Sequence, residues 1–247
     1  MKLYGGIDLH SNNCVVVVLD EEDRVVYEKR LPNDLGYLLL ELAPYRGRVD
    51  GVVVESTFNW YWLVEGLMEA GYPVHLANTA AIQQYTGLQY TDDRSDARWL
   101  AHRLRLKVLP EGYIYPKEER AVRDRLRKRS QLVRQKGTHI LSIQNLMSRN
   151  QGMRLSADKI RQLTEAEVEG LLPQAGLARA VKSNLAVYRC LVEEIDGLEK
   201  VVKQRVKLRP SVQHLLTVEG IGPVLGLTIM LETGDISRFE RVGQLAS

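Results

Sequence analysis

Four acidic residues occupy positions in the predicted strands and helix from which their carboxylates could converge. Asp8 and Glu55 each end a short apolar run that is typical of a strand, and Asp93 and Asp96 lie three residues apart where a helix is predicted to begin. Residues three apart share one face of a helix. Because carboxylate oxygens are the preferred ligands of hard divalent cations such as Mg²⁺, four converging acids would suit phosphodiester chemistry assisted by two metal ions.

Two neighbours of these acids leave alternatives open. Asp92 competes with Asp93 as a ligand, although it would point away from the face that Asp93 and Asp96 share. His10 is either a supporting residue or general base of the site, or an ordinary surface histidine after a strand. A single acid after an apolar strand is most often only a solvated strand end. The metal hypothesis therefore depends on all four acids acting together.

The elements that must position these acids occupy the first half of the chain. Strands are predicted at 3–8, 14–19, 24–29, 49–55 and 73–77, and helices at 34–42, 60–70 and 93–106. This order opens with a meander and predicts an α/β fold, a mixed sheet covered by helices in the ribonuclease H-like layout. In that layout the first and fourth strands are neighbours, which would bring Asp8 beside Glu55.

Two long helices are predicted in the middle of the chain. Apolar residues recur every seven positions from Leu126 to Met147, within a helix expected over about 118–147. A second helix, over about 183–206, has apolar residues at alternating spacings of three and four. Two such stripes joined by a short linker predict an antiparallel coiled-coil hairpin.

The first long helix is strongly basic near its start. Positions 120–136 hold eight Lys or Arg residues and one acid. Four of the arginines share a face roughly opposite the apolar stripe: Arg120, Arg123, Arg127 and Arg134. Because interleaving acids are missing, contact with phosphates is favoured over a merely solvated face. The pattern does not distinguish DNA from RNA.

A glycine turn and a group of aromatic residues are further candidates for nucleic-acid contact. Gly220 and Gly222 lie in a turn like that of a helix-hairpin-helix element, whose backbone N–H groups can approach a phosphate. An ordinary tight turn explains the glycines equally well. Trp60, Trp62 and Trp99 could stack on bases, but the helical spacing of the first two favours the core.

The bulk composition excludes several classes of protein. The 247 residues are 45% apolar, enough for one large or two modest domains, and the formal charge of +3 is nearly neutral. There is no run of eighteen apolar residues and no signal-peptide pattern. Cys14 and Cys190 lie far apart without zinc-site spacing. A cytoplasmic protein with reduced thiols and no membrane partner is expected.

In combination, the motifs resemble the DEDD transposases of bacterial insertion sequences. This family is related to the pilin-gene DNA invertases and is described as recombinases guided by a bridge RNA. The matching segments cover nearly the whole chain in order: 6–10, 54–57 with Trp60, 93–97, 220–223 and 234–239.

The resemblance implies three parts of the chain and their roles. These are a RuvC-like DEDD domain over 1–112, a coiled-coil arm over 113–207 and the start of a helical C-terminal transposase domain over 208–247. It implies that Asp8, Glu55, Asp93 and Asp96 hold Mg²⁺ and carry DNA cleavage and strand exchange. The implied partners are DNA, a structured guide RNA bound partly by the arm, and a second copy of the chain paired through the arm.

One feature departs from the family pattern. In the family, a serine of the C-terminal domain attacks the DNA, downstream of the glycine turn. The nearest serines here, Ser237 and Ser247, do not match that motif. The sequence is therefore expected to represent a C-terminally shortened form.

Three other functions are open from the residues alone. A RuvC-type junction nuclease would use the same four acids with an activated water, and would cleave four-way junctions. A shortened transposase could act as a non-catalytic nucleic-acid-binding regulator or remnant, with salt-sensitive binding and no turnover. A sugar-kinase or actin-like fold also opens with a strand ending in Asp, but it needs two glycine-rich phosphate loops that the sequence lacks.

Overall fold

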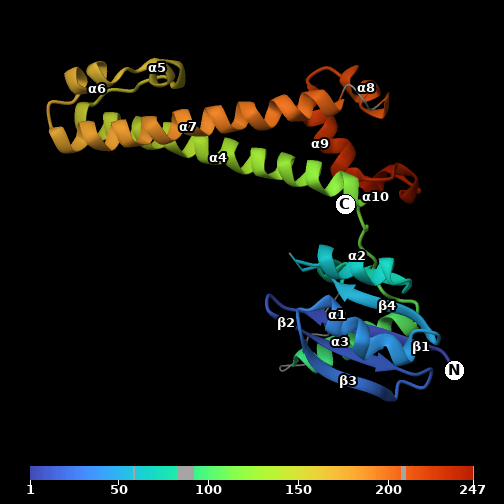
Figure 1. The fold of residues 1–247 in the computed structure, drawn as a ribbon. Coiled ribbons are helices and arrows are strands. Elements are labelled where there is room, and N and C mark those ends of the chain that lie inside the picture. The colour runs from blue at the N-terminus through green and yellow to red at the C-terminus, as the bar shows by residue number, and fades with distance from the viewer. Residues whose placement is uncertain (58, 83–91, 207–209, 247) are drawn as a thin grey trace. The chain divides into compact units, whose positions relative to one another are not determined.

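A computed structural model describes residues 1–57, 59–82, 92–206 and 210–246. The chain divides into two compact units, Met1–Ile114 and Tyr115–Ser247. The first unit holds the sheet and the second is helical (Figure 1). The second unit includes both the residues expected to form the arm and those expected to begin a C-terminal domain.

The first unit is built on one mixed sheet of five strands. The strands are β1 (Leu3–Leu9), β2 (Asn13–Leu19), β3 (Val25–Pro32), β4 (Val49–Glu55) and β5 (Val74–Ala77), in the spatial order β3-β2-β1-β4-β5. β1, β2 and β3 form an antiparallel meander, whereas β4 pairs parallel with both β1 and β5. The sheet matches the predicted α/β layout, including the adjacency of the first and fourth strands.

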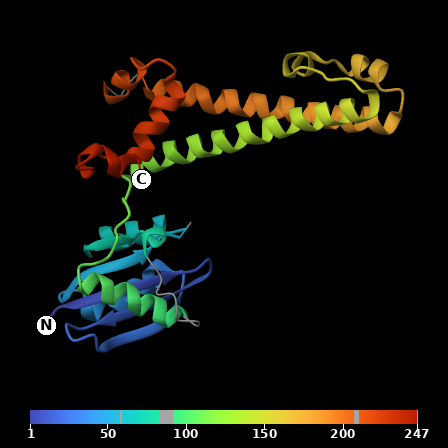
Figure 2. The same ribbon diagram turned by 180° about the vertical axis from the view of Figure 1, so that it is seen from behind.

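Helices cover both faces of this sheet. On one face lie α1 (Leu35–Leu42) and α2 (Tyr61–Glu69), and the core between them and the strands includes Leu38, Leu63 and Val16. The opposite face is covered by α3 (Asp93–Arg105), which lies in front of the sheet in Figure 2. Short 3-10 turns at Ala43–Tyr45 and Thr79–Ala81 complete the described part of the unit. The inner strands β1, β2 and β4 are thus buried on both faces, which explains their nearly continuous apolar sequences, whereas the edge strand β3 is largely exposed.

The tryptophans of α2 belong to the core, as their spacing predicts. Trp60 is buried, and Tyr61 and Trp62 pack against the same cluster. Trp99, on α3, is instead exposed over 39% of its surface. Of the tryptophans considered for base stacking, Trp99 is therefore the accessible one.

The two cysteines differ sharply in accessibility. Cys14 is fully buried on β2, and desolvation together with the nearby Asp8 raises its pKa to about 11. Cys190 is exposed on a helix of the second unit. We expect a thiol reagent to label Cys190 quickly in the native protein and Cys14 only after unfolding. Mass spectrometry of labelled peptides checks this result, with Cys190→Ser as the control, and equal labelling rates would contradict the fold.

The second unit is dominated by two long helices packed along each other. They are α4 (Lys117–Gln151) and α7 (Ala175–Val206), connected through α5 (Ala157–Gln162) and α6 (Glu165–Leu171). Along their contact, Leu132 of α4 packs with Leu191 and Ile195 of α7. The second helix begins eight residues before its predicted start, because Ala178 and Val181 are needed to pack on the connecting helices.

The remaining helices pack back onto this pair. They are α8 (Pro210–Leu216), α9 (Pro223–Thr233), the 3-10 turn Ile236–Arg238 and α10 (Val242–Ala246). Leu227 and Leu231 of α9 share a buried cluster with Val122 of α4 and Val202 of α7. This cluster is why the structure groups the long helices and the C-terminal segment into one unit. Within the described residues, no helix is long and apolar enough to cross a membrane.

The prediction that four arginines of α4 form an accessible basic face is wrong for two of them. Arg120 and Arg123 are 7% and 9% exposed, and therefore do not face solvent. Arg120 donates to the backbone oxygen of Tyr115, and Arg123 lies over the Tyr115 ring. The physical reason is α9, because its Glu232 accepts hydrogen bonds from Arg123 (2.8 Å) and Arg127 (2.8 Å).

Candidate metal centre

The sheet brings the first two predicted acids together. Asp8 and Glu55 directly follow the parallel partners Ile7 on β1 and Val54 on β4. Side chains alternate between the faces of a strand, so Asp8 and Glu55 project on the same side as Val53 and Val15, which pack against α3. Two carboxyl groups therefore meet beneath the N-terminal part of that helix.

The ionisation of Glu55 is strongly perturbed. Desolvation, a hydrogen bond with the Asp8 carboxyl and the negative charges of Asp8 and Asp96 together raise the pKa of Glu55 to about 7. Below this pKa, the protonated Glu55 carboxyl donates a hydrogen bond to Asp8. The influence of Asp96 on Glu55 also places the charge of α3 near the strand ends.

A glycine determines how closely α3 approaches the sheet. A Cβ on Gly6 would lie 2.0 Å from the Ala97 carbonyl oxygen and 2.8 Å from the Ala101 backbone nitrogen. Both alanines are fully buried. Only glycine at position 6 permits this contact, and the contact brings the acids of α3 to the end of β1.

Replacing Gly6 by Ala is therefore expected to push α3 away from β1 and to destabilise the first unit by about 3 kcal/mol. Tryptophan fluorescence can follow unfolding of this unit selectively, because all three tryptophans lie within its residues. Gly47→Ala is a matched control, since its added Cβ would meet no atom within 4 Å. Equal midpoints for the two variants would refute the close helix contact.

At the start of α3, the residue that caps the helix is not one of the predicted ligands. Asp92 is the N-cap and accepts a hydrogen bond from the Ser95 backbone N–H at 2.8 Å. Asp93 and Asp96 occupy the first turn, as the helical spacing predicts. Asp93 is half-buried and forms ion pairs with Arg30 and His10, whereas Asp96 is more exposed. The hydrogen bond from Arg30 lowers the pKa of Asp93.

His10 joins the site more closely than the sequence could establish. Its Nε2 lies 3.1 Å from Asp8 Oδ2 and 3.3 Å from Asp93 Oδ1. The His10 backbone oxygen accepts hydrogen bonds from the side-chain amides of Asn33 and Asn59, both at 2.9 Å. These two bonds fix the turn after β1. Of the alternatives for His10, the structure favours a residue of the site, and the sequence signal was its position two residues after Asp8.

The donor set fits a hard divalent cation. One potential ligand atom from each of Asp8, His10 and Asp93 lies within 4.8 Å of the others. Glu55 is linked to this group by its hydrogen bond with Asp8. Asp96 lies close enough for its negative charge to raise the pKa of Glu55. The Asp8 Oδ2 atom is buried, and although His10 Nε2 lies 3.1 Å away, the two atoms do not form a hydrogen bond with each other or with another group. A buried carboxylate oxygen without a donor is costly, and a cation at this position would satisfy it.

The candidates for nucleic-acid contact in the second unit occupy different environments. Gly222 is the N-cap of α9 and Gly220 has φ +86°, a backbone conformation that favours glycine. Both glycines and Arg134 are exposed, while Arg127 is exposed but paired with Glu232. Ser237 is exposed in a short 3-10 turn capped by Asp235. Ser247 lies outside the described residues.

Comparison with known families matches both parts of the chain. A family model described as "Transposase", named for the DEDD transposases of IS110, matches residues 5–150. A second model, described as "Transposase IS116/IS110/IS902 family", matches residues 212–247. The first match alone covers more than half of the chain and contains all four predicted acids.

Two curated proteins are similar over 98% of this chain. One, from Pseudomonas aeruginosa, is described as a "Probable family 20 transposase" and is 28% identical. The other, from Coxiella burnetii, is a "Transposase for insertion sequence element IS1111A" and is 22% identical. The chain spans 71% and 66% of the lengths of these relatives, respectively. From the family matches and the mixed sheet, this chain belongs to the IS110 family of transposases.

Proposed function

We propose that this chain carries the metal-binding part of a transposase that cleaves and exchanges DNA strands. The supporting observation is the convergence of Asp8 and Glu55 beneath the N-terminal turn of α3, which carries Asp93 and Asp96. These carboxylates would hold Mg²⁺. The bound ion would stabilise the charge that develops on a scissile phosphate.

The residues of the chain would do the positioning. Asp8, the most deeply buried of the four acids, would supply a fixed ligand oxygen, and Glu55 would become a ligand after releasing its proton. Arg30 and His10 offset negative charge around Asp93 in the structure, and a cation would take over part of that role. The attacking nucleophile would come from the C-terminal part of a transposase of this family.

We further propose that the second unit contacts nucleic acid and a second copy of the chain. Exposed Arg134, with Arg127 and the turn at Gly220 and Gly222, would meet phosphates, while the buried Arg120 and Arg123 would not contact them directly. The α4–α7 hairpin would pair two chains and contact a structured guide RNA. The resemblance to RNA-guided recombinases supports both roles.

A cleavage assay tests the catalytic proposal. A plasmid carrying the ends of the insertion element is incubated with Mg²⁺, the chain and a family transposase that supplies the C-terminal nucleophile but has its own metal-site acids replaced by amides, and nicked or recombined products are measured. Mg²⁺-dependent cleavage at the element ends would support the proposal. Salt-sensitive binding without cleavage would replace it by a non-catalytic regulator, and cleavage of any four-way junction would replace it by a junction nuclease.

A further inference from the structure

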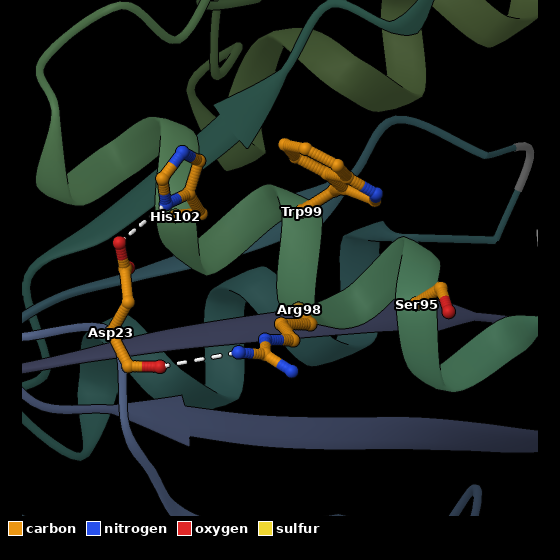
Figure 3. Close-up of a pocket in the computed structure, with 5 residues that line it drawn as sticks. All are labelled: Asp23, Ser95, Arg98, Trp99 and His102. Carbon is orange, nitrogen blue, oxygen red and sulfur yellow. Dashed lines mark hydrogen bonds and ion pairs between the residues drawn. The ribbon is translucent and has the colours of Figure 1, made fainter. Parts of the chain in front are cut away.

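The outer side of α3 carries a pocket that the metal centre does not use. Its volume is about 320 Å³, and Figure 3 shows the five residues that line it: Asp23, Ser95, Arg98, Trp99 and His102. Four of them belong to α3, and Asp23 comes from the turn between β2 and β3. The pocket thus follows the helix whose first turn carries Asp93 and Asp96.

One wall of the pocket is held rigidly by Asp23. Its backbone has φ +63°, an uncommon conformation for a residue other than glycine. The carboxylate accepts hydrogen bonds from His102 Nδ1 at 2.9 Å and from Arg105 Nε at 2.8 Å. Although desolvation opposes it, hydrogen bonding to Arg105 and His102 lowers the pKa of Asp23, so this wall stays anionic and paired. The positive charge of Arg105 is therefore paired with Asp23 within the protein.

Trp99 is held in position but remains accessible. Its ring meets the His102 ring edge to face, with centroids 5.4 Å apart and planes at 84°. Because His102 is fixed by Asp23, this contact limits the rotation of Trp99. The tryptophan is nevertheless 39% exposed. An indole that is oriented by a neighbour and open to solvent is suited to stacking on a planar ligand.

Arg98 supplies a positive charge next to this ring. Its contact in the structure is a long one, 3.4 Å from NH2 to the Asp23 backbone oxygen. No carboxylate within the described parts of the chain forms an ion pair with Arg98. Its positive charge is consequently available to an anion, whereas the charge of Arg105, about two turns further along α3, is paired with Asp23.

We propose that this pocket binds an unpaired nucleotide of the DNA strand beside the scissile phosphate, with Trp99 stacked on the base and Arg98 on a neighbouring phosphate. The inference rests on the proposed function. Trp99 follows Asp96 by three residues, about 4.5 Å along a helix axis. A strand that reaches the carboxylates would therefore pass the pocket, and a base in it must be unstacked from its neighbours.

Photo-crosslinking tests the proposed contact directly. A short single-stranded deoxythymidine oligonucleotide with one 5-iodouracil is bound to the full chain and irradiated, and crosslinked peptides are identified. We expect crosslinking to Trp99. Trp99→Leu should weaken oligonucleotide binding by about 5- to 100-fold, and Trp99→Phe should retain most of it. Arg98→Gln should reduce the slope of log affinity against log salt by about one.

A matched control distinguishes the loss of stacking on Trp99 from the general effect of removing an exposed aromatic ring. Tyr37 on α1 is 41% exposed, similar to Trp99, but lies on the opposite face of the sheet. Tyr37→Leu should leave oligonucleotide affinity unchanged. Full affinity in Trp99→Leu, crosslinking elsewhere, or tighter binding of the ribonucleotide analogue would overturn the proposal.

The failure of this inference is distinguishable from failure of the metal centre. Asp8→Asn should keep the Trp99 crosslink but lose stabilisation by Mg²⁺. Trp99→Leu should lose the crosslink but keep the stabilisation by Mg²⁺, because the Trp99 side chain lies outside the carboxylate cluster. If Asp8→Asn abolished the crosslink without added Mg²⁺, the pocket would not be an independent nucleotide site.

Discussion

Asp8→Asn is expected to weaken Mg²⁺ or Mn²⁺ binding at least tenfold and to lower DNA cleavage by about 10²- to 10⁴-fold. Asp8 is 3% exposed and its Oδ2 makes no hydrogen bond. Because the side chain is buried, a group at the protein surface could not easily replace it as a ligand. The amide has nearly the same size but lacks the charge. Stability without added cation should be preserved or improved, since one of two adjoining carboxylates is removed.

Thermal unfolding with increasing cation concentration measures this effect. An ion at 100 times its Kd stabilises the native protein by about 2.7 kcal/mol, and the variant should lose most of that gain. Asp92→Asn is the matched control: it removes a carboxylate from the same helix, while asparagine is an equally good N-cap. A cation response in Asp8→Asn equal to that of the control would exclude Asp8 as a ligand.

Glu55→Gln is expected to make the protein more stable at pH 8 while removing its response to cations. The pKa of Glu55 is raised from 4.5 to about 7 in the folded protein. The folded state therefore holds a proton that the unfolded state releases, and stability falls as pH rises from about 4.5 through 7. After a discount for partial solvent exposure and coupling to Asp8, we expect a gain of about 1–2 kcal/mol for the variant at pH 8.

The gain should vanish below about pH 3.5, where the wild-type glutamic acid is protonated in both states. For the wild-type protein, cation affinity should fall by nearly tenfold per unit as pH drops below 7, since the proton and the cation compete for the same carboxylate. Urea unfolding at pH 5 and pH 8, with and without Mg²⁺, measures both effects. A wild-type protein whose stability and cation affinity are flat across this range would show that Glu55 ionises normally.

The sequence predicted most of the first unit because each element has a local cause there. The β-branched run before Leu19 and the acids at the start of α3 are recognisable without tertiary information. The adjacency of Asp8 and Glu55 was predicted from the ribonuclease H-like layout, in which the first and fourth strands are neighbours, and the observed strand order agrees. The role of Gly6 could not be predicted, because it arises from contact with a helix about ninety residues further along the chain.

The second unit shows why helical periodicity was insufficient for the basic residues. Stepping residues around α4 placed Arg120 and Arg123 opposite the apolar stripe, on a face expected to meet solvent. A separate helix, α9, packs on α4 and provides Glu232 as a hydrogen-bond partner of Arg123. The sequence shows which side of a helix is charged, but it does not show which distant segment will cover that side.

An anomalous diffraction experiment on crystals grown with Mn²⁺ tests the shared cation site most directly. We predict a peak between the ends of β1 and β4 and the first turn of α3, bound by Asp8 and Glu55 and reached by Asp93 and Asp96 directly or through water. Crystals saturated with Mn²⁺ that show no ion there, or that show Asp96 directed away from Asp8, would contradict the account.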